Sequence, residues 1–228
     1  MSRTLVNIGA IGLFGVIARA MMATKGLETE LGFYGAYHSD PWNQLIHFVF
    51  VPCIWWSICV FLCYAPLPVL PAVGLGSIGG HELTWGTLQL CVYVAFYISL
   101  DVVAGAITSA LLLGFYLQAS SAVAGERARA AAAAGKGGKK KMTWFKFAFI
   151  LHALAWYMQI HPGHKVFEGV KPALLDSFGQ ALGVAPMFAF LEGVWAAGAL
   201  PDMKARVLVL VSENRAAMCA AGEAMPWC

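Results

Sequence analysis

Charged side chains are scarce in this chain. Asp, Glu, Lys and Arg make up 12% of the 228 residues, whereas soluble domains carry about 25%. Hydrophobic residues make up 60%, and the mean hydropathy is +0.69. This shortage of charge excludes an ordinary soluble domain. Because apolar segments run almost end to end, the sequence predicts a single membrane domain.

Cysteine is sparse too, and no two cysteines form a CxxC pair. The six are Cys53, Cys59, Cys63, Cys91, Cys219 and Cys228. Cys59 and Cys63 share a helix face, so a soft-metal site there is an alternative to the small buried side chains that we favour. The cysteines give no disulfide framework and therefore no indication of an oxidising compartment.

Positive charge is concentrated in one segment. Within fifteen positions the chain carries Arg127, Arg129, Lys136, Lys139, Lys140 and Lys141, opposed only by Glu126. In a membrane protein such a run is typical of a solvated loop on the cytoplasmic or matrix side. We therefore expect a basic, Ala- and Gly-rich loop over 119–142 and no nucleic-acid binding.

The hydrophobic runs predict an all-α, polytopic transmembrane helix bundle of about five spans, because one crossing needs about 20 apolar residues. The predicted spans are 43–64, two short spans within 83–118, 143–160 and 173–200. A single helix over 83–118 would be about 54 Å long, so we expect a turn at Asp101, where an acid reaches the membrane surface.

The remaining segments complete the domain plan. Residues 1–30 form an N-terminal hydrophobic segment, for which a span, a surface helix and a targeting presequence are all open. Residues 31–200 form the membrane domain, and 201–228 form a surface tail.

The number of predicted crossings places four polar residues on one membrane face, here called the histidine face. It places the basic loop on the opposite face. The gathered residues are His38, Asp101, His161 and His164. The positive-inside rule places the basic loop in the cytoplasm or matrix, opposite this face. His47 lies about 9 Å and His152 about 12 Å below it, so we expect these two rings to meet. Glu192 is expected near the opposite face.

Histidines at membrane depth indicate function, because ionisable groups are costly there and imidazole is a common metal ligand. We expect His47 and His152 to hold a redox metal such as Fe(II), with His38 and His164 completing the site. Supporting contacts are expected from Tyr37, Asn43, Gln159, His161 and Glu168. Histidines satisfied by helix–helix hydrogen bonds, and histidines that ligate haem or chlorophyll, are the alternatives. Lys165 and Lys171 are candidates to pair with a carboxylate head group.

Two motif blocks add a resemblance. The first is Tyr37-His38, Asn43, Ile46-His47 and Pro52. The second is His152, Trp156, Gln159, Gly163-His164, Phe167-Glu168-Gly169, Pro172-Ala173-Leu174, Ala185-Pro186 and Glu192. Over about 31–200 the chain resembles the family of the yeast endoplasmic-reticulum 2-hydroxy fatty acid dioxygenase, which converts phytosphingosine-derived acids to odd-numbered fatty acids.

The resemblance implies an enzyme of fatty acid and sphingolipid metabolism in the endoplasmic-reticulum membrane. It would use Fe(II) and O2 to convert a 2-hydroxy fatty acid to the acid one carbon shorter. The implied iron ligands are His38, His47, His152 and His164.

Two other functions remain open. One is a non-catalytic accessory subunit of a large respiratory or photosynthetic membrane complex, in which 1–30 and the basic loop are docking surfaces. The other is a haem- or pigment-binding protein. Mitochondrial inner membrane and plastid membrane are the alternative locations.

Overall fold

The computed structural model describes residues 23–67, 77–78, 81–134, 143–175, 178–223 and 225–228, with a few positions between 9 and 19. The main elements of this part are the helices α2 (Leu27–Gly35), α3 (Pro41–Cys63), α4 (Trp85–Leu100), α5 (Val102–Ala134), α6 (Thr143–Met158), α7 (Phe178–Ala196) and α8 (Pro201–Ala220). A π-helix, η2 (Gln159–Glu168), extends α6, and a short 3-10 helix, η3 (Ala173–Leu175), precedes α7. The strands β1 (Ser77–Ile78) and β2 (His81–Glu82) pair as a small antiparallel hairpin. The all-α prediction is confirmed.

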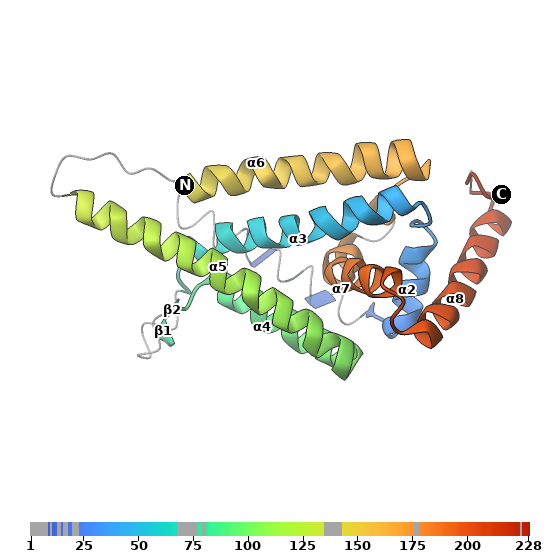
Figure 1. The fold of residues 1–228 in the computed structure, drawn as a ribbon, viewed down its shortest axis with the longest axis horizontal. Helices are drawn as coiled ribbons and strands as arrows, with labels where there is room; N and C mark the ends of the chain where they lie inside the picture. Colours follow the sequence, from blue (N-terminus) through green and yellow to red (C-terminus); the bar gives the residue numbers. More distant parts are fainter. Residues whose placement is uncertain are drawn as a thin grey trace.

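Helix α3 is the central element, and its N-terminus is capped by Asp40. Asp40 accepts hydrogen bonds from the backbone N–H groups of Trp42 and Asn43 at 2.8 and 3.2 Å, and Pro41 occupies the first helical position. The helix is 23 residues long and mostly apolar, and it packs alongside α6 (Figure 1). It matches the predicted span 43–64.

Helices α4 and α5 form a hairpin that turns at Asp101, as predicted. The Asp101 carboxylate accepts a hydrogen bond from the Ala104 N–H at 2.7 Å and so caps α5. A Cβ on Gly105 would collide with the carbonyl oxygen of Tyr97, so glycine permits the close turn. Helix α5 then runs to Ala134, which corrects the prediction of a loop from residue 119: residues 119–134 are helical, and 135–142 lie outside the described residues.

Fewer helices than predicted are long enough to cross a bilayer. Among the described residues, α3 and the segment Val102–Ala133 of α5 have the required length and hydropathy. Ala181–Ala196 and Pro201–Ala220 qualify only as a pair bent by 120°, and α4 is a shorter apolar helix of 16 residues. The turn at Asp101 limits the length of α4, and the change to a π-helix at Gln159 ends α6 after 16 residues.

At one end of the bundle a polar contact joins three helices. The buried carboxylate of Glu126 on α5 accepts hydrogen bonds from the Tyr64 hydroxyl after α3 and the Trp144 N–H at the start of α6. Arg127 pairs with Glu82 of β2. The first basic residue of the cluster is therefore used in a structural ion pair.

The opposite end gathers α2, α7 and α8 (Figure 1). Arg206 of α8 forms an ion pair with Glu28 of α2 at 2.7 Å. The hydrogen bond that Arg206 donates in this pair lowers the pKa of the Glu28 carboxyl below its ordinary value. The nearby negative charge of Asp101 raises the same pKa. Asp101 therefore lies near α2, which agrees with the predicted gathering of Asp101 and His38 on one face.

The C-terminal tail contains a feature that the cysteine pattern did not predict. Cys219, in the last turn of α8, forms a disulfide with Cys228, with a Cα–Cα distance of 5.4 Å. The Arg215 guanidinium lies 4.2 Å from the ring centre of Trp227, so the tail folds back over α8. Most of the predicted N-terminal segment 1–30 lies outside the described residues, which take up the chain continuously from residue 23.

Candidate metal centre and apolar pocket

Three histidines meet in the interior at the α2 end of α3. His38 follows α2, His47 lies in the second turn of α3, and His164 lies in η2. Their ring centres are 4.4 Å apart for His38 and His47, and 5.0 Å apart for each of the other two pairs. One nitrogen from each ring lies within 4.8 Å of the other two, and all three residues are buried. We call these residues the histidine triad.

Hydrogen bonding sets the orientation of His47. Its Nδ1–H donates to the backbone carbonyl oxygen of Asn43 at 2.9 Å, so Nε2 carries the lone pair. Both ring nitrogens of His38, and Nδ1 of His164, are buried without a hydrogen-bond partner. Because buried polar atoms normally find partners, the unpaired nitrogens in this triad fit a bound metal ion.

Burial also keeps the triad in its ligand form. It lowers the pKa of His38 well below the ordinary value, and the neighbouring His47 and His164 act in the same direction. Burial lowers the pKa of His164 to about 3, with His47 adding to the effect. Neutral imidazole binds transition metals, so both rings are ready to coordinate at neutral pH.

The π-helix η2 brings His164 to this place. π-Helical turns are rare and occur mostly at functional sites. A Cβ added to Gly163 would lie 2.6 Å from Asn43 Oδ1 and 3.5 Å from Cε1 of His47. The absent side chain therefore lets the backbone of η2 approach α3 closely enough for His164 to join His47.

Glu168, the last residue of η2, ties this segment to the turn that carries His38. Its carboxylate accepts hydrogen bonds from the Ser39 N–H at 2.7 Å, the Ser39 hydroxyl at 2.6 Å and the Asp40 N–H at 3.0 Å. The amide of Asn43 donates to it at 3.0 Å. Glu168 and Asn43 thus hold η2 against the turn that carries His38.

His152 is not part of the triad. Its Nδ1 lies 2.8 Å from the Ser57 hydroxyl, and its Nε2 accepts a hydrogen bond from the Trp156 indole at 3.0 Å. Ser57 follows His47 by ten residues, which is about 15 Å along α3. The prediction that His152 lies level with His47 is therefore wrong. The helix does not end at the histidine face near Ile160 but continues into η2, which delivers His164 instead.

Of the other predicted supporting residues, Gln159 and Tyr37 are buried near the triad and His161 is not. Gln159 is buried, lines the pocket described below and donates to the carbonyl oxygen of Ala155 at 3.3 Å. Tyr37 is buried beside His38 and packs edge-on against Phe33. His161 is exposed and stacks on Tyr157, so it does not join the triad.

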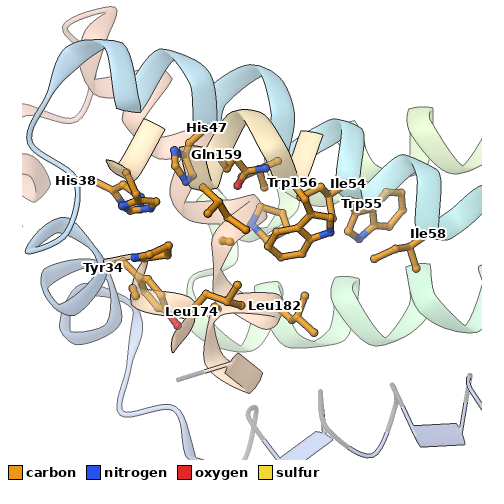
Figure 2. Close-up of a pocket in the computed structure, with 18 of the residues that line it drawn as sticks. Tyr34, His38, His47, Ile54, Trp55, Ile58, Trp156, Gln159, Leu174 and Leu182 are labelled. Atoms are coloured by element: carbon orange, nitrogen blue, oxygen red, sulfur yellow. The ribbon is translucent and has the colours of Figure 1, made fainter. Parts of the chain in front are cut away.

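An apolar pocket adjoins the triad (Figure 2). The three histidines and Gln159 supply polar groups to its wall, and aliphatic and aromatic side chains form most of the remainder. Helix α3 contributes Val51, Ile54, Trp55 and Ile58. The sequence analysis missed these four residues, although their spacing from His47 places all of them on one helix face.

Glu192 is also displaced from its predicted position. It lines a second pocket of about 760 Å³ together with His38 and with Lys204 and Arg215 of α8. Glu192 was expected near the opposite face because 173–200 was read as a complete crossing. The structure instead places Glu192, near the end of α7, on the side of His38, so α7 runs toward the histidine face rather than away from it.

The chain is similar to known proteins over most of its length. Residues 24–195 match the model of a family described as 2-hydroxy-palmitic acid dioxygenase Mpo1-like. The 2-hydroxy-palmitic acid dioxygenase MPO1 of Saccharomyces cerevisiae is 30% identical over 179 residues, covering 78% of this chain and 86% of the yeast protein. No solved structure matches the chain. The triad and the α3 wall of the pocket lie inside the matched region, and α8 lies outside it.

Proposed function

Because the chain belongs to the Mpo1-like 2-hydroxy-palmitic acid dioxygenase family, we propose that it is an Fe(II)-dependent enzyme that shortens 2-hydroxy fatty acids by one carbon. The observation that carries the proposal is a buried histidine triad beside an apolar pocket. A 2-hydroxy fatty acid has the matching shape, since its hydroxyl and carboxylate are polar and its tail is apolar.

His38, His47 and His164 would hold the iron, each through one ring nitrogen. Three protein ligands would hold the metal without filling its coordination shell, as at other non-haem iron oxygenase sites. Fe(II), when bound, supplies the one-electron chemistry that allows O2 to react with a closed-shell substrate.

The proposed reaction balances without a further reductant. One 2-hydroxy acid and one O2 give the acid one carbon shorter, carbon dioxide and water. The bond between C1 and C2 breaks, C2 gains an oxygen atom, and all four electrons that reduce O2 come from the substrate.

The chain's own residues would position the reactants and exclude water. Asn43 orients His47, and Glu168 fixes the turn that carries His38. Tyr34 and Leu174 line the pocket beside the triad (Figure 2), so a bound head group would be largely shielded from solvent. His152 would act indirectly, because its hydrogen bond holds Trp156 at the pocket wall.

The test combines metal analysis with an assay on 2-hydroxypalmitate in the presence and absence of O2. We expect iron in the purified protein and turnover only with O2. His47→Ala and His164→Ala should each lose more iron affinity than the about 10–100-fold typical of changes outside the ligand set. His152→Ala is the matched control: it should keep its iron, because its ring bonds Ser57 and Trp156. Full iron and turnover in both triad variants would overturn the proposal.

We further propose that the enzyme works in the endoplasmic-reticulum membrane and takes its substrate from the bilayer. The apolar helices α3 and α5 and the motif resemblance support this location. Cell fractionation of a tagged chain tests it, since recovery in mitochondria or plastids would contradict the proposal.

A further inference from the structure

We infer, building on the proposed function, that the apolar pocket measures the length of the acyl chain and that Ile58 forms its stop. The lining residues of α3 follow His47 at intervals of four, seven, eight and eleven positions: Val51, Ile54, Trp55 and Ile58. This spacing places them in a row on one helix face. Figure 2 shows Ile54, Trp55 and Ile58 following His47 along α3, with Ile58 farthest from the histidines.

The length of this row fits a long fatty acid. Eleven residues of α-helix rise about 16 Å from His47 to Ile58. An extended hydrocarbon chain with bonds of about 1.5 Å advances about 1.25 Å per carbon, so about 13 carbons fit beyond the reacting carbon. The same 16 Å is close to half of the about 30 Å bilayer core, which is the share of one acyl chain.

Packed side chains lie beyond Ile58, at the far end of the row. Ile58 packs against a separate apolar cluster made of Leu62, Ala65 and Trp85. Beside it, Trp55 is buried and meets the Tyr93 ring edge-on at a centroid distance of 6.0 Å.

A hydrogen bond fixes this end of the wall. The Tyr93 hydroxyl donates to the carbonyl oxygen of Leu182 on α7 at 2.7 Å. A tail that reaches Ile58 therefore meets a firm wall, and a longer tail has to displace packed side chains.

A steric stop is the form of selection that suits a substrate dissolved in a membrane. Lipid tails are as apolar as the pocket, so moving methylene groups from bilayer to pocket yields little hydrophobic free energy. Discrimination among long acids must then come from the cost of overpacking at the end of the pocket rather than from burial of each added carbon.

The experiment is a competition between two 2-hydroxy acids in one reaction, with product ratios measured by mass spectrometry. Val51→Trp fills the pocket about 6 Å from His47 and leaves room for about five carbons. The ratio of 2-hydroxypalmitate to 2-hydroxyhexanoate turnover should fall at least about tenfold, equivalent to about 1.4 kcal/mol of overpacking.

Ile58→Ala should act in the opposite direction. The ratio of 2-hydroxyarachidate to 2-hydroxypalmitate turnover should rise about fivefold, because removal of the Ile58 side chain relieves overpacking at the stop. The matched control is Val49→Trp, at a position on α3 that is 47% exposed and outside the pocket. It should leave both ratios unchanged.

Both substrates compete for the same enzyme sample, so the product ratio does not depend on how much of a variant folds. If Val51→Trp gives no active protein, Val51→Phe is used in its place. Ratios in the Val51 and Ile58 variants equal to those of the parent chain would overturn the inference. Failure of the parent chain to convert any 2-hydroxy acid would instead overturn the proposed function.

Discussion

Replacing Glu168 by alanine is expected to weaken iron binding, although Glu168 is not one of the three proposed ligands. The change removes a carboxylate that joins η2 to the turn between His38 and α3. Four hydrogen bonds are lost together, from the Ser39 N–H, the Ser39 hydroxyl, the Asp40 N–H and the Asn43 amide.

The size of the effect follows from the burial of these donors. The Asn43 bond is fully buried, and a buried hydrogen bond to a charged group is worth about 1.5–3 kcal/mol. Water can reach the three partly buried donors, so each of these contributes only about 0.5 kcal/mol. The total is about 3–4.5 kcal/mol. Part of it will appear as lower stability, and the iron affinity should fall about 10–100-fold.

The assay is anaerobic equilibrium dialysis against Fe(II), together with thermal unfolding of the metal-free protein. Glu126→Ala is the matched control, because Glu126 is equally buried and accepts hydrogen bonds from Tyr64 and Trp144. It should lower the unfolding temperature and leave iron affinity unchanged. Iron affinity at the parental level in Glu168→Ala, or an equal loss in both variants, would refute the proposed link between this carboxylate and the triad.

Two further substitutions test local parts of the argument. Gly163→Ala places a Cβ 2.6 Å from Asn43 Oδ1, and this overpacking should lower the folding stability by about 1–3 kcal/mol and lower the iron content. Gly114→Ala is the control: no atom lies within 4 Å of its added Cβ, so it should keep its iron. Asp101→Ala removes the bond to the Ala104 N–H and should cost about 1 kcal/mol in denaturant unfolding without changing iron affinity. Unchanged iron in Gly163→Ala, or unchanged stability in Asp101→Ala, would contradict the respective contacts.

The sequence was sufficient for the fold class and for most of the candidate site. His38, His47 and His164 converge as predicted, because the lengths of the hydrophobic runs determine which segments return to the same face. The turn at Asp101 was predictable for a related reason, since a single helix over that segment would exceed the bilayer.

The sequence did not predict the features that depend on the direction of a helix or on where it ends. The depth of His152 was counted from Ile160, but η2 extends the helix past that point and nothing in the residues 159–168 signals a π-helix. Glu192 was misplaced because hydropathy gives the length of an apolar segment but not the direction in which its helix runs. The disulfide between Cys219 and Cys228 forms because the tail folds back over α8, and the spacing of the cysteines does not predict this fold.

The π-helix makes the site sensitive to chain register. An α-helix rotates about 100° per residue and a π-helix somewhat less, so deleting a single residue between Gln159 and Gly163 would turn everything after it by about a quarter of a circle. His164 would face away from its two partners while each of the three histidines remained in the sequence. A relative that keeps all three but is one residue shorter here would therefore have the components of a metal centre without the centre itself.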